Sequence, residues 1–176
     1  MGNPKTDFMN AIQDLTTKKS LDKITVDDLC NAAGYSRQTF YRHYTDKYDL
    51  VFSIYQQTLE NRMEELDDYW DFDAHCKTML ACFSENRAFY KKAFTDSSFP
   101  SSFHDRFIEY SVRYTIEAIG KHKVNKDIQI LIRCWVSNTI SLVEQWTVKG
   151  MEKDEQWLVD MFRRLMPEEV KALYLN

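Results

Sequence analysis

Apolar side chains recur along much of the chain at the three- to four-residue spacing of amphipathic α-helices. Phe8, Ile12 and Leu15 form the first such stripe, on one face of a helix. We therefore expect an all-α fold with about nine to ten helices. The spacing predicts these helices near residues 5–19, 25–34, 37–44, 46–69, 74–85, 86–95, 102–120, 125–149, 152–165 and 167–174.

Chain-breaking residues are scarce, with 4 Gly and 3 Pro among the 176 residues. Scarce breakers mean few tight turns, which argues against a β-sandwich or barrel with a turn every ~8–12 residues. The same scarcity excludes collagen-like and Pro/Gly-rich disordered chains. Long helices joined by short polar links remain.

The sequence predicts neither a membrane span nor a signal peptide. The longest uncharged stretch of the C-terminal half, 134–143, is far shorter than the roughly 20 apolar residues that cross a bilayer. Residues 1–8 are polar and contain no apolar signal core. The 4 cysteines form no C-x-x-C pair, so we expect a cytoplasmic protein with free, buried thiols.

Two short predicted helices, 25–34 and 37–44, are joined by the link Ala-Gly-Tyr-Ser, which is typical of a helix-turn-helix. Gly34 supplies the positive φ that such a turn requires, and Thr25 is a good N-cap. Phe40 is the apolar residue expected to anchor the second helix. Its other side chains can be exposed, and they are Arg37, Gln38, Thr39, Tyr41, Arg42 and His43.

The net charge of −4 argues against nucleic acid as a partner, but the charges are unevenly distributed. Between Leu29 and Thr45 there is no acid, whereas two arginines and His43 are present. Six acids and no base lie in 63–74, where we expect an elbow. The helix-turn-helix region therefore has a small positive face, suited to a DNA groove with flanking phosphates.

Residues 24–50 closely resemble the DNA-binding signature of TetR-type transcriptional regulators. The departures are mild: Cys30, Tyr35 and Tyr44 stand where Ala, Val and Phe are common. The run 135–166 resembles the ligand domains of the subgroup of dihydroxyacetone kinase regulators. The residues that match the signature are Thr25, Val26, Leu29, Ala33, Gly34, Ser36, Thr39, Phe40, Tyr41, His43, Lys47 and Leu50.

The resemblance implies a helix-turn-helix domain, 1–48, followed by a helical ligand-binding and dimerisation domain, 49–176. In this family the second helix of the motif enters the major groove, which would place Arg37, Gln38 and Thr39 nearest the bases. The resemblance also implies that Tyr41, His43 and Lys47 reach phosphates, as does the Thr25 hydroxyl. The alternative is that Tyr41 and Tyr44 pack and Arg42 is a solvated charge. The full expected DNA-contact set is Thr25, Ser36, Arg37, Gln38, Thr39, Tyr41, Arg42, His43 and Lys47.

Aromatic residues follow helical spacing in 103–114 and suggest either a packed core or a cavity for an apolar or aromatic effector. Ile108, Val112 and Ile116 give the same helix a second apolar face, so we expect it to be central in its bundle. The candidate pocket residues are Met79, Phe83, Tyr90, Phe94, Phe103, Phe107, Tyr110, Tyr114 and Trp135.

The predicted helices 125–149 and 152–165 carry more apolar residues than one core stripe requires. We expect them to form a four-helix interface in a two-fold homodimer. Such a dimer would set two recognition helices about one DNA turn apart, on an inverted-repeat operator. The candidate interface residues are Trp135, Ile140, Val143, Trp146, Trp157, Met161, Phe162 and Leu165.

An enzyme is the first rival class, but no nucleophile elbow, P-loop, zinc-protease or dinucleotide motif occurs. His75, Cys76, Cys82 and His104 are too irregularly spaced to favour a metal site. We expect no catalytic, cofactor or metal site. The favoured function is a ligand-responsive repressor released from double-stranded operator DNA by a small molecule, and the alternative is a TetR-like coactivator that acts through protein contacts.

Overall fold

The computed structural model describes residues 2–64, 71–96 and 101–175, apart from the side chains of 101–103. These ranges form ten α-helices and two 3-10 helices, with no strand, which confirms the predicted all-α fold. None of the described helices is long and apolar enough to cross a membrane. The helices are α1 (Pro4–Lys18), η1 (Leu21–Lys23), α2 (Val26–Ala33), α3 (Arg37–His43), α4 (Lys47–Met63), α5 (Phe72–Glu85), α6 (Arg87–Phe94), α7 (Ser101–Ile119), η2 (Lys121–Lys123), α8 (Lys126–Val148), α9 (Glu155–Leu165) and α10 (Glu168–Tyr174).

Helix α4 ends at Met63, earlier than the predicted helix 46–69. Half of the acidic segment 63–74 lies outside the described residues, as does half of the predicted loop 95–102. Glycine follows the end of two long helices as predicted, with φ of +95° at Gly120 and +103° at Gly150. The other predicted helices agree with the structure to within a few residues at each end.

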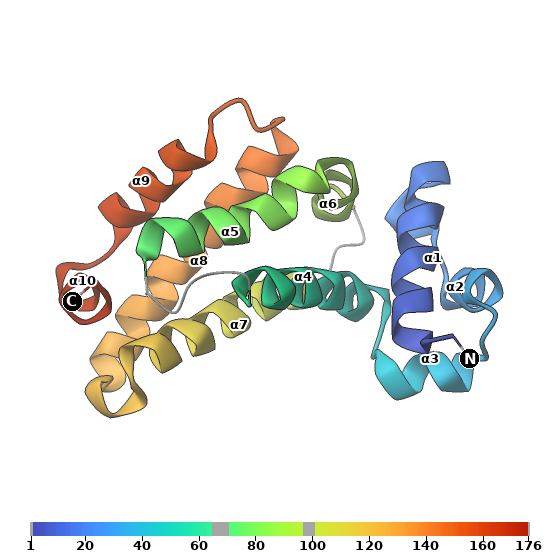
Figure 1. Cartoon of the computed structure of the whole chain (residues 1–176), viewed down its shortest axis with the longest axis horizontal. Coiled ribbons are helices and arrows are strands. Elements are labelled where there is room, and N and C mark those ends of the chain that lie inside the picture. Colours follow the sequence, from blue (N-terminus) through green and yellow to red (C-terminus); the bar gives the residue numbers. More distant parts are fainter. Residues whose placement is uncertain (1, 65–70, 97–100, 176) are drawn as a thin grey trace.

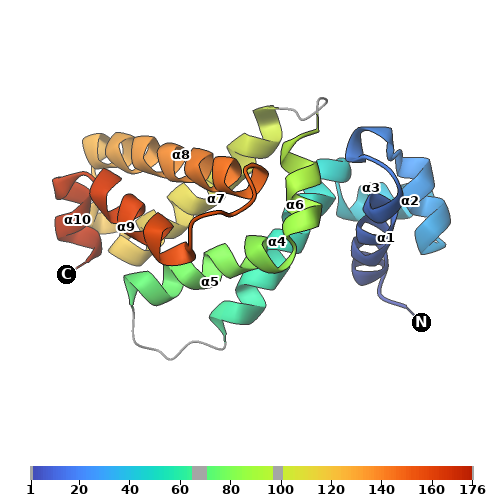
Figure 2. The ribbon, with the colours of Figure 1, turned by 90° about the horizontal axis from the view of Figure 1, so that it is seen from above.

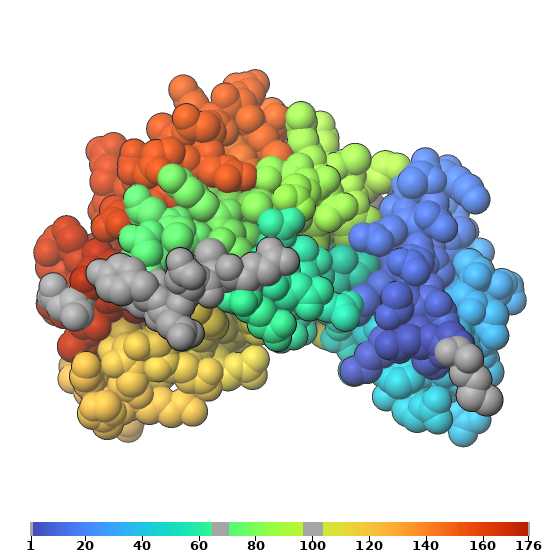
Figure 3. All heavy atoms as spheres, viewed as in Figure 1, coloured from blue at the N-terminus to red at the C-terminus, as the bar shows by residue number. Residues whose placement is uncertain are grey.

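The molecule has two lobes (Figures 1 and 3). Helices α1–α3 form an N-terminal lobe at one end, and α5–α10 form the larger C-terminal lobe. Helix α4 runs from the first lobe into the second, and it contacts α1, α5 and α7. Helix α8 runs along one edge of the larger lobe beside α7, as Figure 2 shows, and it also contacts α5, α6, α9 and α10.

Local sequence rules explain the helix-turn-helix. Thr25 and Asp28 form a reciprocal capping box at the start of α2, which satisfies two backbone amides that have no helical partner. Gly34 ends α2 with φ of +77°, a left-handed conformation that costs a glycine little. Ser36 then caps α3 by accepting a hydrogen bond from the amide of Thr39 at 3.2 Å. The two short helices therefore begin and end where the motif requires.

An aromatic cluster holds α3 against α1. The Phe8 ring of α1 meets Phe40 edge to face at 5.2 Å and Tyr44 at 6.2 Å. Phe8 and Phe40 are completely buried. The Tyr44 hydroxyl also donates to the Lys5 carbonyl at 3.3 Å, and the Tyr35 hydroxyl donates to Asp7 at 2.8 Å. Buried rings and two long-range hydrogen bonds thus fix the inner face of α3 and leave its outer face to solvent.

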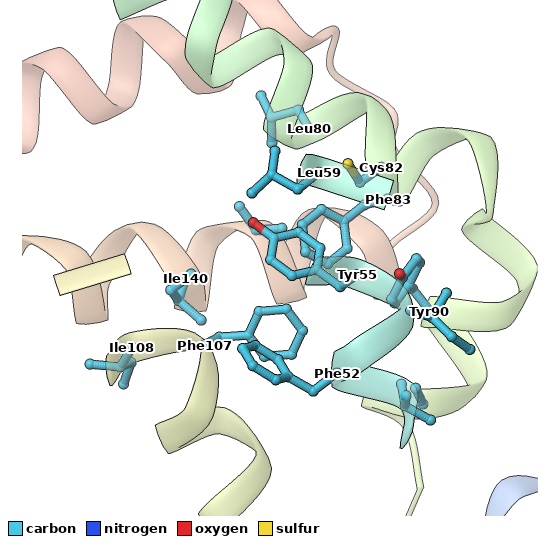
Figure 4. Close-up of a cluster of buried hydrophobic side chains, with 14 of the residues drawn as sticks. Phe52, Tyr55, Leu59, Leu80, Cys82, Phe83, Tyr90, Phe107, Ile108 and Ile140 are labelled. Carbon is cyan, nitrogen blue, oxygen red and sulfur yellow. The ribbon is translucent and has the colours of Figure 1, made fainter. Parts of the chain in front are cut away.

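A second aromatic cluster joins α4 to the larger lobe (Figure 4). Tyr55 of α4 lies 4.9 Å from Phe107 of α7 and 5.0 Å from Phe83 of α5, between ring centroids. Phe52 meets Phe107 edge to face at 5.0 Å. Pairs of this kind contribute about 0.5–1.5 kcal/mol beyond the area they bury. The middle of α4 is therefore part of the core of the C-terminal lobe.

Replacing Phe8 by Ala should open a cavity under α3 and remove the ring contacts with Tyr35, Phe40 and Tyr44. The free energy of unfolding should fall by about 3–5 kcal/mol, measured by urea denaturation with circular dichroism. Tyr41→Ala is the control, because that ring is 50% exposed, and its effect should stay below about 1 kcal/mol. Equal losses for the two variants would contradict this account of the N-terminal core.

Candidate DNA-binding surface and effector cavity

The outer face of α3 presents polar and basic side chains to solvent. Arg37, Gln38, Tyr41 and Arg42 are exposed, whereas Thr39 is half-buried beside the Ser36 cap. The helix lies at the edge of the N-terminal lobe, away from α5–α10 (Figure 1). This placement brings four of the nine expected DNA-contact residues together on one accessible surface, which we name the α3 face: Arg37, Gln38, Tyr41 and Arg42.

Arg37 is held by a carboxylate on the preceding helix. Its guanidinium donates to Asp27 at 2.8 Å and to the Tyr41 hydroxyl at 3.4 Å. The hydrogen bond to Asp27 raises the pKa of Arg37 above its ordinary value. Both partners are more than half exposed, so the pair is weak and can open in favour of another acceptor.

Thr25 has a structural role that sequence reasoning assigned only in part. Its hydroxyl donates to the Asp28 carboxylate at 2.8 Å and accepts from the Asp28 amide at 3.1 Å. Asp28 also pairs with Lys19 at 2.7 Å, and this contact holds the pKa of the carboxyl well below its usual range. The Thr25 hydroxyl is therefore engaged in the cap of α2 rather than directed to a phosphate.

The structure places Lys47 differently from the expectation that it reaches a phosphate. Its ammonium donates to the carbonyls of Leu21, Asp22 and Ile24, at 2.7, 3.2 and 3.2 Å. An ammonium has three hydrogens, so these bonds use all of its donors. Burial also lowers its pKa. Lys47 thus fixes the turn before α2 to the start of α4.

His43 is half-buried at the end of α3, and its ring lies 6.3 Å from that of Tyr44. Its Nε2 is buried and has no hydrogen-bond partner among the described residues. This geometry keeps His43 at the margin of the α3 face.

A cavity of about 60 Å³ lies between α4, α5, α7, α8, α9 and α10. Its lining contains aromatic, aliphatic and hydroxyl side chains but no Asp, Glu, Lys or Arg. An engineered cavity of roughly 150 Å³ admits benzene, so this smaller space fits only a few heavy atoms unless side chains move. The lining residues are Tyr55, Leu59, Phe72, His75, Cys76, Met79, Tyr110, Ser111, Tyr114, Thr115, Trp135, Val136, Thr139, Ile140, Phe162 and Tyr174.

His75 is the one histidine among the residues that line the cavity. Its ring stacks on Tyr114 with centroids 4.7 Å apart, and its Nδ1 lies 3.3 Å from the Tyr114 hydroxyl. Burial lowers the pKa of His75 to about 4, so the imidazole is neutral at pH 7. Burial also raises the pKa of the Cys76 thiol to about 12, so it is a protonated thiol rather than a thiolate. The cavity wall therefore carries hydrogen-bonding groups without a formal charge.

Sequence reasoning found part of this cavity. Met79, Tyr110, Tyr114 and Trp135 line it. The side chain of Phe103 lies outside the described residues. The remaining candidates do not line the cavity but pack beside it in the aromatic cluster: Phe83, Tyr90, Phe94 and Phe107.

The lining residues that sequence reasoning missed come from all six helices around the cavity. His75 precedes Met79 by one helical turn, and this spacing was a usable signal on α5. Tyr55 of α4 belongs to neither expected set, because nothing in its local pattern separates a cavity-lining ring from a core ring. Tyr174 comes from the last short helix, whose position in space no local pattern predicts.

Five expected dimer-interface residues are buried within the single chain instead. Helix α8 contacts α5, α6, α7, α9 and α10 on its inner side, and these contacts account for most of its wide apolar surface. Trp135 also donates to the Phe162 carbonyl at 2.9 Å, which ties α8 to α9. The residues that their own chain covers are Trp135, Ile140, Val143, Trp146 and Phe162.

The other three expected interface residues form an outward stripe on α9. Trp157 is 40% exposed and Leu165 is 41% exposed, and Met161 lies half-buried between them at one-turn spacing. Ile130 of α8 is 62% exposed. Apart from Tyr41, the large apolar side chains exposed on the described surface are therefore on α8 and α9.

The N-terminal lobe presents α3 to solvent and anchors it from within by buried rings, and it is joined to an all-helical lobe with a cavity. This arrangement is typical of a helix-turn-helix regulator. Comparisons with known families agree. Residues 9–54 match the family described as bacterial regulatory proteins, tetR family, and residues 71–168 match the transcriptional regulator C-terminal region. The chain belongs to the TetR family of transcriptional regulators, as the signature in 24–50 predicted.

Individual members of the family are similar to all or part of the chain. The chain is 28% identical over 94 residues to the HTH-type dhaKLM operon transcriptional activator DhaS of Lactococcus lactis subsp. lactis (strain IL1403). That match covers 53% of this chain and 50% of the relative, about half the length of each. A solved structure described as dihydroxyacetone kinase operon activator DhaS superposes with a TM-score of 0.64, at 18% identity and 97% coverage of both chains. A TetR regulator from Streptococcus agalactiae 2603V gives 0.59, at 21% identity and 93% coverage of both.

The stability of the protein should fall in mild acid because of His75. The unfolded chain takes up a proton near pH 6.5, whereas the folded chain does so only near pH 4, so acid favours the unfolded state between these values. At pH 5, compared with pH 7.5, His75 should cost the wild type about 2 kcal/mol of unfolding free energy. The His75→Gln variant should not show this loss of unfolding free energy when both proteins are measured by urea denaturation at the two pH values. The same pH dependence in both proteins would contradict the neutral, buried imidazole.

Proposed function

We propose that this regulator binds an inverted-repeat operator in double-stranded DNA as a homodimer and is released by a small effector. The observation that carries the proposal is the α3 face, which is exposed and polar on a helix whose inner side is fixed by buried rings. A recognition helix needs this combination, because base contacts demand a rigid helix with adaptable side chains.

Arg37 and Gln38 are the proposed base-reading residues. An arginine pairs with guanine O6 and N7, and a glutamine pairs with adenine N6 and N7, each contributing about 1–3 kcal/mol of discrimination. Arg37 would exchange its Asp27 partner for a base. Tyr41 and Arg42, further along the same exposed face, would contact phosphates.

The proposed dimer interface uses the solvent-facing sides of α8 and α9. It is supported by the concentration of exposed apolar residues there: Ile130, Trp157, Met161 and Leu165. A two-fold axis at these helices would pair the recognition helices roughly 34–36 Å apart, or a multiple of that distance.

The proposed effector site is the cavity lined by His75 and Tyr114. A charged ligand there would lose its hydration without gaining a counter-charge, so the wall favours an uncharged molecule with a hydrogen-bonding group. The tyrosine hydroxyls and the imidazole would orient it. To move the protein from mostly bound to mostly released, the effector must favour one state by roughly 10⁴-fold.

Two questions about regulation have two candidate answers each: whether the protein represses or activates, and whether it acts through DNA or through protein contacts. The family resemblance favours repression relieved by the effector, whereas the names of the two DhaS relatives describe activators. A promoter-reporter assay with the selected operator decides the sign. The further alternative is a coactivator that works through protein contacts, and it is favoured if the purified protein enriches no sequence from random DNA.

Arg37→Ala and Tyr41→Ala should weaken binding to the operator that the wild type selects from random-sequence DNA. For Arg37→Ala the expected loss is about tenfold or more, with relaxed specificity at one base pair, because a bidentate pair is removed. Gel shifts and circular dichroism measure affinity and folding. The control is Lys121→Ala, which removes an equal charge from an exposed site on η2. Unchanged operator affinity in both test variants would refute the assignment of the α3 face.

The wild type should be a dimer at micromolar concentration in multi-angle light scattering. Leu165→Glu should shift the mass towards one chain, because it places a charge in the proposed apolar contact on α9. Ala118→Glu, at an exposed position on α7, adds the same charge elsewhere and should stay dimeric. A monomeric wild type, or a Leu165→Glu dimer as stable as the control, would contradict the interface.

A further inference from the structure

Only three residues, 44–46, separate the recognition helix α3 from α4. Tyr44 caps the end of α3, and Asp46 caps the start of α4 by accepting from the Asp49 amide at 2.7 Å. The short link leaves little freedom between the two helices. Whatever fixes the first turn of α4 therefore also fixes the end of α3, and we name residues 44–49 the α3–α4 joint.

An arginine from the C-terminal lobe is bound to this joint. The guanidinium of Arg106, on α7, donates through Nη1 to Asp49 and through Nη2 to the Thr45 hydroxyl at 3.0 Å and to Asp46 at 3.3 Å. The same Asp49 carboxylate accepts from the Thr45 amide at 2.7 Å. One side chain thus joins all three polar residues of a small, already connected network.

The position of Arg106 excludes a direct role on DNA. Its side chain is 29% exposed, and both of its terminal nitrogens are engaged by the joint. A planar guanidinium with several acceptors holds their relative positions better than a single ion pair, because its donors have fixed directions. The contact is therefore suited to positioning rather than to phosphate recognition.

Arg106 also lies on the helix that forms one wall of the cavity. Tyr110 and Tyr114 follow it at intervals of one helical turn, and both line the cavity. A shift of α7 caused by an occupant of the cavity would therefore move Arg106 as well. The path from cavity wall to joint runs along one rigid helix and ends in one set of hydrogen bonds.

We propose that Arg106 is the positioning residue that couples the C-terminal lobe to the recognition helix, by holding the α3–α4 joint. The proposal rests on the operator binding proposed above. It predicts that loss of Arg106 loosens the joint without unfolding the protein. Asp46 still caps α4, and Asp49 still accepts from the Thr45 amide, because neither hydrogen bond involves the arginine.

The test compares Arg106→Gln with a matched control, Arg62→Gln, in the full-length protein. Arg62 pairs with Glu85, and its side chain is also 29% exposed, but it lies at the opposite end of α4. Hydrogen exchange of the amides in 45–50 should be about tenfold faster in Arg106→Gln and unchanged in Arg62→Gln. Exchange within twofold of the control would overturn the proposal.

Affinity for the selected operator gives the second readout. Arg106→Gln should bind it about tenfold more weakly, while affinity for unrelated DNA stays within twofold, because the α3 face is intact but less fixed. Arg106→Lys should recover part of the loss, since an ammonium reaches one carboxylate but not the whole network. Operator affinity equal to that of Arg62→Gln would overturn the positioning role. If the wild type selects no operator, the proposed function fails, and the exchange measurement still decides whether Arg106 holds the joint.

A cavity-filling substitution tests the coupling without an identified effector. Ser111→Leu, on α7, places a larger side chain in the cavity. It should change exchange in 45–50 by at least about threefold when Arg106 is present and have no effect there in the Arg106→Gln background. Thr139→Leu, from α8, replaces it if the first variant does not fold. An equal effect in both backgrounds, or none in either, would overturn the coupling.

Discussion

Burial of α4 on several sides is the constraint on which the rest of the structure depends. Its N-terminal turn belongs to the joint with α3, whereas its middle is fixed by Phe52 and Tyr55 among rings of the larger lobe. Leu50 and Val51 are completely buried between these regions. A helix buried in this way cannot rotate about its axis without disturbing both lobes, because close-packed interiors do not deform continuously. Small motions of α4 are therefore transmitted as rigid-body changes.

Local rules in the sequence were enough to predict the helix-turn-helix. The turn requires a left-handed conformation, which Gly34 adopts at little cost, and Ser36 caps the helix that follows. Phe40 is an apolar residue that anchors this helix. Each of these properties depends on a few adjacent residues. The helices of the larger lobe were predicted equally well, because their periodicity is also local. The domain boundary at 48 and 49 remains a prediction, since α4 belongs to the cores of both lobes.

Partners distant in sequence were beyond this kind of reasoning. Periodicity indicates that Trp135 and Val143 are buried, but it does not say whether their own chain or a second copy covers them. Charge likewise marks Lys47 as a cation without revealing the three carbonyls that receive its hydrogens. Arg106 gave no signal at all, because its partners lie more than fifty residues away in the chain. Cavity, ion-pair network and interface all depend on how helices meet, which only the fold defines.

The size of the cavity also has a consequence for time scales. Its walls are packed side chains from six helices, and about 60 Å³ of space lies between them. A molecule larger than a few atoms fits only after side chains of these walls move, so its association rate would be limited by that rearrangement as well as by diffusion. Dissociation would be slowed by the same barrier. A regulator of this design would respond to the sustained presence of its effector and average over brief fluctuations in its concentration.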